Sequence, residues 1–320
     1  MSEIAGVRVG HWTDPVAATG CTVILPPPGT TAAAEARGGG PATRESELLA
    51  PLSSHSGVTA LLLSGGSAFG LDAASGVVRW CEERRLGHRA GAWTVPIVAA
   101  ACIYDLGIGD GARRPGAEEG YAAAAAATEG PHERGSVGAG TGATVGKLRG
   151  QRGWCKGGLG AASRRLYDGT TVAALAVVNC WGDVIDADGS VIAGAFDPEL
   201  GFLGAAERTV TAPPEHPRLA AAGNTTLACV VTDARLTKSG LGQLARMAHD
   251  GLARAVSPVH TPVDGDVVFC LATGARDASL FACGAAAAEA VAEAIRDGAR
   301  SAGSLAGVPT GSQRRDSLDR

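Results

Sequence analysis

Short apolar runs that end at glycine or proline alternate along this chain with alanine-rich stretches of helical length. Apolar runs of about 4–8 residues indicate buried strands, and longer stretches with a period of about 3.6 residues indicate amphipathic helices. An alternation of the two is typical of α/β proteins, in which helices cover the faces of a sheet. The sequence therefore predicts an α/β fold, and the pattern alone fits a doubly wound sheet as well as a layered sandwich.

The expected secondary structure is most distinct in the last third of the chain. Strands are expected at residues 58–63, 171–178, 226–232 and 267–272, and helices at 69–80, 121–127, 236–256 and 284–296. In the helix at 236–256, one face carries Leu241, Leu244, Leu252 and either Met247 or Ala248. The chain after residue 225 is thus predicted to run strand–helix–strand–helix.

Two segments lack any such pattern. Residues 207–224 contain Pro213, Pro214 and Pro217 without periodicity, which is typical of a flexible linker. Residues 301–320 are polar and are expected to form a disordered tail. No internal repeat appears, so one domain is expected over residues 1–320.

Composition argues against several classes of function. The 320 residues carry a net charge of −4, which argues against nucleic acid as the main partner. No stretch of about 18 apolar residues predicts a membrane span, and the N-terminus lacks the basic and apolar regions of a secretory signal. The eight cysteines form no CxxC pair, so we expect reduced, buried thiols in a cytoplasmic protein. The seven histidines show neither HxxxH nor HxH spacing, so no metal site is expected.

Two glycine-rich segments raise the question of a phosphate site or a nucleophile. Residues 135–147 fail the phosphate-loop pattern because Leu148 stands where Ser or Thr is needed, and they fail the dinucleotide pattern because Ala143 replaces a glycine. We interpret this segment as a tight loop that lets backbones pack closely. The segment Ser64-Gly65-Gly66-Ser67 fits a helix cap and anion-binding turn better than a turn that carries a nucleophile.

The segment Gly223-Asn224-Thr225-Thr226 joins the proline-rich linker to an expected buried strand. A threonine hydroxyl is a poor nucleophile unless a base lies next to it. Cleavage of the Asn224–Thr225 bond would release an α-amine with a pKa of about 7.7–8.0, which suits a general base at neutral pH. The spacing alone favours a plain turn that enters a strand, and the self-cleaving interpretation stays open beside it.

An ordered set of short segments resembles one family over nearly the whole chain, roughly residues 4–300. The segments are GVRVGHW (6–12), ATGCTV (18–23), LSGGSAFGLDA (63–73), VGAGTGA (137–143), GNTT (223–226), AHDGLAR (248–254) and DGD (264–266). The family comprises self-processing amidohydrolases: L-aminopeptidase/D-amidase-esterases, β-peptidyl aminopeptidases and nylon-oligomer hydrolases. The resemblance implies an inactive precursor that cuts itself before a Ser or Thr, which becomes the N-terminal nucleophile. It also implies a four-layer αββα sandwich of the Ntn-hydrolase type, a homotetramer of processed units, and no cofactor or metal.

The resemblance assigns roles residue by residue. Thr225 matches the nucleophile and the cut follows Asn224, which divides the chain into residues 1–224 and 225–320. Asp264 and Asp266 match the pair beside the nucleophile. The positions that match oxyanion and positioning residues are Asn179 and Tyr104, and the position that matches a site lysine of the nylon-hydrolysing branch is Lys147.

The residue types are compatible with these roles. Asn179 ends an expected strand and offers an amide donor to an oxyanion, and Lys147 is one of only three lysines among 28 basic residues. Asp264 and Asp266 would point to the same side if the strand began there. Two carboxylates so close together should have one raised pKa unless a cation lies between them. The alternative for this pair is a solvated turn ahead of the strand.

Three functions stay open on the sequence. The first is hydrolysis of amide bonds in short peptides or in linear ω-amino acid oligomers. The second is an acyl transfer similar to that of the ornithine acetyltransferases, and the third is a homologue that no longer processes itself. The resemblance places Ser and Glu in aminopeptidase-type members where this chain has Asp264 and Asp266. The Asp pair with Lys147 therefore leans slightly towards linear ω-amino acid oligomers.

Overall fold

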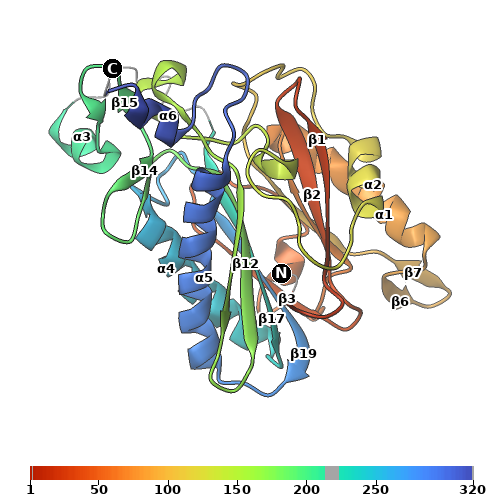
Figure 1. Ribbon diagram of the computed structural model, residues 1–320. Coiled ribbons are helices and arrows are strands. Elements are labelled where there is room, and N and C mark those ends of the chain that lie inside the picture. The colour runs from red at the N-terminus through yellow and green to blue at the C-terminus, as the bar shows by residue number, and fades with distance from the viewer. Residues whose placement is uncertain (2, 213–222, 319–320) are drawn as a thin grey trace.

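Two five-stranded β-sheets pack face to face, and helices cover both outer faces (Figure 1). The computed structural model describes residues 1, 3–212 and 223–318. Buried side chains form one cluster between the sheets and one between each sheet and its helices. The four-layer αββα sandwich is thereby confirmed, and the doubly wound single sheet is excluded.

The two sheets have the same sequence of strand directions. The first has the order β1 (Arg8–Asp14), β2 (Thr19–Leu25), β5 (Ala60–Ser64), β8 (Val98–Cys102) and β4 (Ala42–Arg44). The second has the order β11 (Leu159–Arg165), β12 (Thr171–Asn179), β17 (Thr225–Ala234), β19 (Val267–Arg276) and β3 (Thr31–Ala36). In each sheet only the third and fourth strands are parallel, and the other neighbours are antiparallel.

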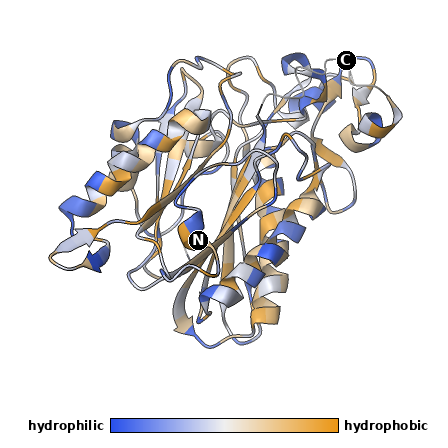
Figure 2. Cartoon of the chain, turned by 180° about the vertical axis from the view of Figure 1, so that it is seen from behind, coloured by the Kyte–Doolittle hydropathy of each residue, from blue (hydrophilic) through white to orange (hydrophobic). Residues whose placement is uncertain are grey.

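Each sheet has its own pair of covering helices. Helices α1 (Ala73–Glu83) and α2 (Ala117–Ala125) pack on the first sheet, and α4 (Lys238–Ala255) and α5 (Leu280–Ser301) pack on the second. Figure 2 shows hydrophobic residues along the strands, whereas hydrophilic residues gather on the helices and loops. The predicted face of α4 is buried at Leu241, Leu244, Ala248 and Leu252, and Met247 is partly exposed.

The central strands are apolar along their whole length because both of their faces are buried. Successive side chains of a strand point to opposite faces. In β12 and β17 the odd-numbered residues lie between the sheets: Ala173, Leu175, Val177, Leu227, Cys229 and Val231. The even-numbered residues face α4 and α5, as do Ala174, Ala176, Ala228 and Val230. By the same alternation, Asn179 and Thr225 belong to the face between the sheets.

Shorter elements surround one end of the sandwich and its edges. They are the hairpin β6 (His88–Ala90) and β7 (Trp93–Val95), the pair β9 (Thr144–Val145) and β10 (Cys155–Lys156), the three-stranded group β14 (Val191–Ala193), β13 (Asp183–Ile185) and β18 (Val256–Ser257), the pair β15 (Phe196–Asp197) and β16 (Gly201–Phe202), and the helices α3 (Ala205–Thr211) and α6 (Gly311–Asp316).

Most of the predicted helices and strands are present, and one predicted helix is split into two elements. The last four occur in the predicted order as β17, α4, β19 and α5. The helix predicted at 69–80 is divided, because Ser67–Asp72 forms a 3-10 turn and α1 begins only at Ala73. All eight cysteines are buried and unpaired. Among the described residues, no helix combines the length and apolar character that crossing a membrane requires.

The disordered tail predicted at 301–320 is wrong for most of its length. α5 extends to Ser301, a bridge joins Leu305 to Val308, and α6 follows. Arg314 donates hydrogen bonds to the carbonyls of Arg152 and Trp154. The polar side chains of this segment thus bind distant backbone, which a local sequence pattern does not reveal.

The linker predicted at 207–224 is ordered at both ends. α3 covers residues up to Thr211, and its first N–H group, that of Ala205, donates to the buried carboxylate of Asp183 (2.6 Å). At the other end, Asn224 forms a parallel bridge with Asp264. Residues 213–222 lie outside the described residues.

Candidate active site

Thr225 and Asn179 lie opposite one another across two strands of the second sheet. Thr225 begins β17, Asn179 ends β12, and the two are paired in the antiparallel ladder. Thr225 is 4% exposed and Asn179 is fully buried. The structure thus brings the predicted nucleophile and the predicted oxyanion residue to one place, on the face between the sheets.

The peptide bond between Asn224 and Thr225 has polar groups around its carbonyl. The carbonyl oxygen of Asn224 accepts a hydrogen bond from the backbone N–H of Gly265 (2.7 Å) and one from the hydroxyl of Thr225 (2.5 Å). A fixed N–H donor at a carbonyl oxygen polarises the carbonyl and stabilises negative charge that develops on it. The hydroxyl of Thr225 therefore lies beside a polarised carbonyl in its own chain.

Glycine is required at position 265 by close packing. A Cβ at Gly265 would lie 2.7 Å from the Oγ1 atom of Thr225 and 2.7 Å from the carbonyl oxygen of Gly40. The N–H of Gly40 in turn donates to the carbonyl of Asp264 (2.9 Å). The triple glycine 38–40 follows β3 and holds the loop that carries the two aspartates.

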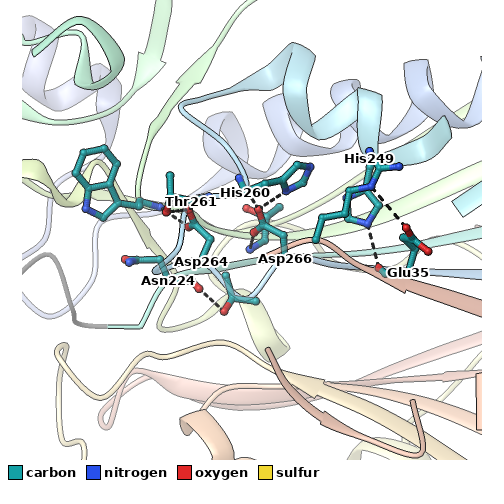
Figure 3. Close-up of polar contacts among 11 residues, drawn as sticks. Glu35, Asn224, His249, His260, Thr261, Asp264 and Asp266 are labelled. Atoms are coloured by element: carbon teal, nitrogen blue, oxygen red, sulfur yellow. Dashed lines mark hydrogen bonds and ion pairs between the residues drawn. The ribbon is translucent and has the colours of Figure 1, made fainter. Parts of the chain in front are cut away.

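Asp264 is a buried carboxylate with three donors. Its Oδ1 accepts from the N–H of Trp181 (3.2 Å), and its Oδ2 accepts from the N–H (3.1 Å) and the hydroxyl of Thr261 (Figure 3). Burial raises the pKa of Asp264 to about 6, and the neighbouring Asp266 carboxylate adds to this rise. The rise expected for one member of the pair is therefore found at Asp264.

Asp266 has a different set of donors. Its Oδ1 accepts from the N–H of Thr226 (2.7 Å), and its Oδ2 accepts from the backbone N–H (3.1 Å) and the ring Nδ1 of His260 (2.8 Å). Asp264 and Asp266 are each 1% exposed, which excludes the solvated turn. β19 begins only at Val267, so the strand geometry assumed for the pair does not apply.

The side-chain amide of Asn179 joins three segments. Its Oδ1 accepts from the N–H of Thr144 (3.0 Å) and from the Nζ of Lys147 (3.3 Å), and its Nδ2 donates to the backbone carbonyl of Tyr104 (3.2 Å). An amide nitrogen carries two hydrogens, and this is its one bond within the described part of the chain. Tyr104 thus contacts Asn179 through its backbone, and its side chain packs against Gly223.

Lys147 is buried between Asn179 and an aromatic ring. Its Nζ lies 4.4 Å from the centroid of the Trp154 ring, a distance that permits a cation–π interaction. Burial lowers the pKa of Lys147 to about 8, against the opposing effect of acidic neighbours that include Asp264 and Asp105. The hydrogen bond of Lys147 goes to Asn179, so its effect on Asp264 is electrostatic and not a direct contact.

Lys156 fixes the glycine-rich loop that supports Asn179. Its Nζ donates to the carbonyls of Thr141 (3.0 Å), Ala143 (2.5 Å) and Gly157 (3.2 Å). Burial lowers the pKa of Lys156 to about 7. The loop is the tight packing segment that was predicted, and its Thr144 donates to Asn179.

The turn Ser64–Ser67 binds an internal anion. Gly66 has a φ of +83°, and its N–H donates to the carboxylate of Asp105 (2.6 Å), which also accepts from the hydroxyl of Thr19 (2.7 Å). The N–H of Gly66 thus binds a carboxyl group of the same chain, whose pKa is raised by burial, and no side chain caps the 3-10 turn. Because Asp105 follows Tyr104, this turn also fixes the Tyr104 backbone beside Asn179.

Comparison with known proteins identifies the family. A family model described as peptidase family S58 matches residues 1–312. The chain belongs to peptidase family S58. An uncharacterized aminopeptidase of Mycobacterium tuberculosis (strain ATCC 25618 / H37Rv) is 42% identical, over 97% of this chain and 96% of that protein. A 6-aminohexanoate-oligomer endohydrolase of Paenarthrobacter ureafaciens is 32% identical, over 86% of this chain and 75% of that protein.

Solved structures share the fold of this S58 chain. The L-aminopeptidase D-Ala-esterase/amidase of Ochrobactrum anthropi, described as a variant of the Ntn hydrolase fold, has a TM-score of 0.73 at 20% identity and covers 99% of this chain and 93% of its own. A β-aminopeptidase of Burkholderia sp. has a TM-score of 0.72 at 24% identity, with 99% and 92% covered. The Ntn-hydrolase-like fold is thus confirmed. Membership of family S58 makes the chain a hydrolase of peptide or amide bonds, and it favours hydrolysis over the acyltransferase alternative.

Several contributors to the S58 site escape prediction from the sequence. They are His260 and Thr261, which bind the two aspartates, the loop glycine Gly265, and the triple glycine 38–40. Histidine spacing tests only for a metal site, but a histidine six residues from a carboxylate pair is a usable signal. The triple glycine lies far from the site in sequence, and only the β3–β19 pairing brings it there.

Proposed function

We propose that this S58 peptidase cuts its own Asn224–Thr225 bond and then hydrolyses amides with Thr225 as an N-terminal nucleophile. The observation that carries the proposal is the position of the Thr225 hydroxyl, 2.5 Å from the Asn224 carbonyl oxygen that Gly265 also binds. A hydroxyl, a polarised carbonyl and two buried carboxylates are the groups that such a cleavage needs.

In self-cleavage, the Thr225 oxygen attacks the carbonyl carbon of Asn224. The hydroxyl proton passes to a carboxylate of the Asp264–Asp266 pair, and the C–N bond breaks as the Thr225 nitrogen takes up a proton. The product is an ester between Asn224 and the Thr225 oxygen. Water then hydrolyses this ester, which leaves a carboxylate on Asn224 and a free amine on Thr225.

In turnover, the new amine of Thr225 acts as the base for its own hydroxyl. An α-amine has a pKa of about 7.7–8.0, so a substantial fraction is unprotonated near neutral pH. The hydroxyl attacks the substrate amide, an acyl-enzyme forms, and water releases the acid. We propose that the second Nδ2 hydrogen of Asn179 is donated to the oxyanion of the reaction. Lys147 holds the side-chain amide of Asn179 in place. The side chain of Tyr104 packs against the segment that precedes the cleaved bond.

For substrates, we propose short peptides or linear ω-amino acid oligomers. The support is the aspartate pair with Lys147 together with relatives named an aminopeptidase and a 6-aminohexanoate-oligomer endohydrolase. Substrates of both classes are linear molecules that contain an amide bond and a free amine. The buried carboxylates Asp264 and Asp266 supply the negative charge that would orient an amine near the site.

The test of self-cleavage is intact-mass analysis of the purified chain over time. Residues 1–224 and 225–320 should appear at about 22 and 10 kDa of the total 31.9 kDa. Thr225→Val keeps the shape but removes the hydroxyl and should stay uncut, whereas Thr225→Ser keeps a hydroxyl and should still be cut. A wild-type chain that remains full length after long incubation would refute the proposal.

The substrate class is tested with the processed protein. Amino-acid p-nitroanilides, β-amino acid amides and linear 6-aminohexanoate oligomers are compared by kcat/KM, each with and without ornithine as acyl acceptor. Release of free acid in every case supports hydrolysis, and acyl transfer to ornithine would support the alternative function. Cleavage of aminoacyl amides with no action on the oligomers would contradict the inferred preference for ω-amino acids.

We also propose that processed units form a homotetramer in the cytoplasm. The support is the resemblance to self-processing amidohydrolases together with the eight unpaired, buried thiols. Light scattering of the processed protein measures the assembly directly. A mass of one or two units would contradict the tetramer.

A further inference from the structure

Asp266 receives two hydrogen bonds from one residue. The backbone N–H of His260 lies 3.1 Å and its ring Nδ1 lies 2.8 Å from the same oxygen, Oδ2. A carboxylate oxygen accepts, so Nδ1 carries the hydrogen of this bond. The other oxygen of Asp266 accepts from the N–H of Thr226, the residue next to Thr225. His260 therefore holds the carboxylate that is hydrogen-bonded to the nucleophile strand.

The backbone of His260 is held in an unfavourable conformation. Its φ is +53°, in the left-handed region that non-glycine residues adopt rarely. This conformation lets the N–H and the ring of one residue reach the same carboxylate oxygen. Strained backbone of this kind persists where surrounding contacts over-determine it, and it gathers at functional sites.

The ring of His260 is backed by a second buried histidine. His249 of α4 lies edge-on to it, with 4.8 Å between ring centroids, and its Nε2 donates to the carbonyl of Glu35 (3.0 Å) (Figure 3). Burial lowers the pKa of His249 to about 4, so its ring is neutral near pH 7. His249 therefore fixes the plane of the His260 ring without adding a charge.

We propose that His260 is a positioning residue that holds the Asp266 carboxylate against the N–H of Thr226, the residue next to the nucleophile. This inference rests on the proposed function, because the pair is taken as the proton acceptor in self-cleavage. The geometry supports it, because the N–H and the ring of His260 both bind Oδ2 of Asp266 while Oδ1 accepts from the N–H of Thr226.

The His260 ring and the two carboxylates have charged or titratable neighbours on each packed element. The neighbours are His249 on α4, Glu35 and Arg37 on and after β3, Cys180 after β12, and Lys147 in the glycine-rich segment, and the hydroxyl of Thr261 on their own loop is a neutral donor. Among the described residues, only His260 donates a side-chain hydrogen bond to Asp266, and none of the neighbours named above does so. Removal of the imidazole therefore removes the one side-chain donor of this carboxylate.

The decisive comparison is between His260→Asn and His260→Gln. Asparagine places its amide nitrogen where Nδ1 stands and tolerates positive φ, so it should restore the bond to Asp266. Glutamine places its amide nitrogen near the Nε2 position and should not. We expect His260→Asn to self-cleave within about threefold of the wild-type rate and His260→Gln to be at least about tenfold slower, because a hydrogen bond to a charged group is lost.

The pH profile of self-cleavage separates positioning from folding. Loss of a donor to Asp266 raises the pKa of the pair, so the acidic limb of His260→Gln should move to higher pH, whereas that of His260→Asn should not. His260→Gly removes the ring and relieves the positive φ, and it should behave like His260→Gln. If His260→Gln and His260→Gly both cleave themselves at the wild-type rate, with an unchanged acidic limb of the pH profile, the inference is overturned.

Failure of the inference is distinguishable from failure of the proposed function. If the wild-type chain never cuts itself, the proposed function fails and so does the role built on it. If the wild type cuts itself and all three variants follow its rate and pH profile, only the role of His260 fails. If thermal unfolding shows that His260→Gly does not fold, the comparison of His260→Asn with His260→Gln still tests the role of His260.

Discussion

At the residue scale, burial moves two pKa values of the site towards neutrality. The pKa of Asp264 rises to about 6 and that of Lys147 falls to about 8, and in both cases loss of water is the main cause. Near pH 7 each group is charged but close to its midpoint, so it exchanges a proton at small cost. Before the chain is cut, Thr225 has no free amine. The proposed self-cleavage therefore needs another base, and we assign that role to the Asp264–Asp266 pair.

The first prediction concerns the pH dependence of self-cleavage. An acceptor must be unprotonated, so the rate should fall about tenfold per pH unit below about 6, the value to which burial raises the pKa of Asp264. Asp264→Asn should slow the cut strongly and remove this limb. Asp183→Asn is the matched control, because Asp183 is a buried carboxylate bound to Ala195 and Ala205 instead. An acidic limb that persists unchanged in Asp264→Asn would exclude Asp264 as the acceptor.

The second prediction concerns Asn179 in the processed enzyme. Loss of one oxyanion donor costs on the order of 10²–10³ in kcat, with little change in KM, so Asn179→Ala should lower kcat by that factor. Steady-state kinetics on an amino-acid p-nitroanilide measures it. A wild-type kcat in this variant would remove Asn179 from the mechanism.

At the element scale, two lysines hold loops by the same means. The Nζ of Lys156 donates to the carbonyls of Thr141 and Ala143 in the glycine-rich segment and of the adjacent Gly157, and the Nζ of Lys238 donates to those of Leu48, Ser53 and His55. A lysine ammonium has three donors and therefore binds three carbonyls at once. Only the loop held by Lys156 carries a group, Thr144, that binds a site residue.

The third prediction uses this matched pair. Lys156→Met should lower the free energy of unfolding by about 2 kcal/mol or more, because buried carbonyls lose their donor, and Lys238→Met should lower it by less, because its carbonyls are only part-buried. Lys156→Met should also lower kcat by releasing the Asn179 amide, whereas Lys238→Met should leave kcat within about twofold. Urea unfolding and steady-state kinetics are measured on the same preparations. Equal kcat in the two variants would show that the glycine-rich loop does not position Asn179.

The elements could be predicted from the sequence where burial leaves a local pattern. β17 and β19 are apolar on both faces, and α4 and α5 carry one apolar stripe over many turns. α6 could not be predicted, because its arginines bind carbonyls more than a hundred residues away. The sandwich itself came from the resemblance, since strand order is set by pairings between distant segments and not by periodicity.

Some residues of the site could likewise be predicted from the sequence, and others could not. The roles of Thr225 and Asn179 came from the resemblance, the expected strands were compatible with them, and the structure pairs the two residues. The donors of the aspartates could not be predicted, because Trp181 and Thr226 act through backbone N–H groups that any residue would supply. Gly265 and the triple glycine 38–40 act through close packing, which a sequence without coordinates does not express.

At the scale of the whole molecule, the two products of the proposed cut would be interleaved. β17 and β19 belong to residues 225–320 and form the middle of the second sheet, and β12 and β3 on either side belong to residues 1–224. Separation would break three strand ladders, those of β12 with β17, β3 with β19 and β13 with β18, and would expose the cluster between the sheets. The cut thus changes the covalent chain at one point and leaves the hydrophobic core whole.

The fourth prediction follows from this interleaving. After self-cleavage, both fragments should co-elute in gel filtration at the volume of the uncut Thr225→Val variant and should separate only in denaturant. Thermal unfolding followed by circular dichroism should show one cooperative transition. Elution of the smaller fragment by itself under native conditions would contradict the prediction.

In the proposed self-cleavage, the contact between the Thr225 hydroxyl and the Asn224 carbonyl also determines the kinetic order of maturation. Attacking oxygen, carbonyl and N–H donor all belong to one chain, so each molecule is its own substrate once and only once. The half-time of activation is then independent of protein concentration, and an uncut Thr225→Val chain mixed with active enzyme stays uncut. If the chain cuts itself as proposed, a cell that makes this protein receives its activity after a fixed delay from synthesis, whether it holds few copies or many.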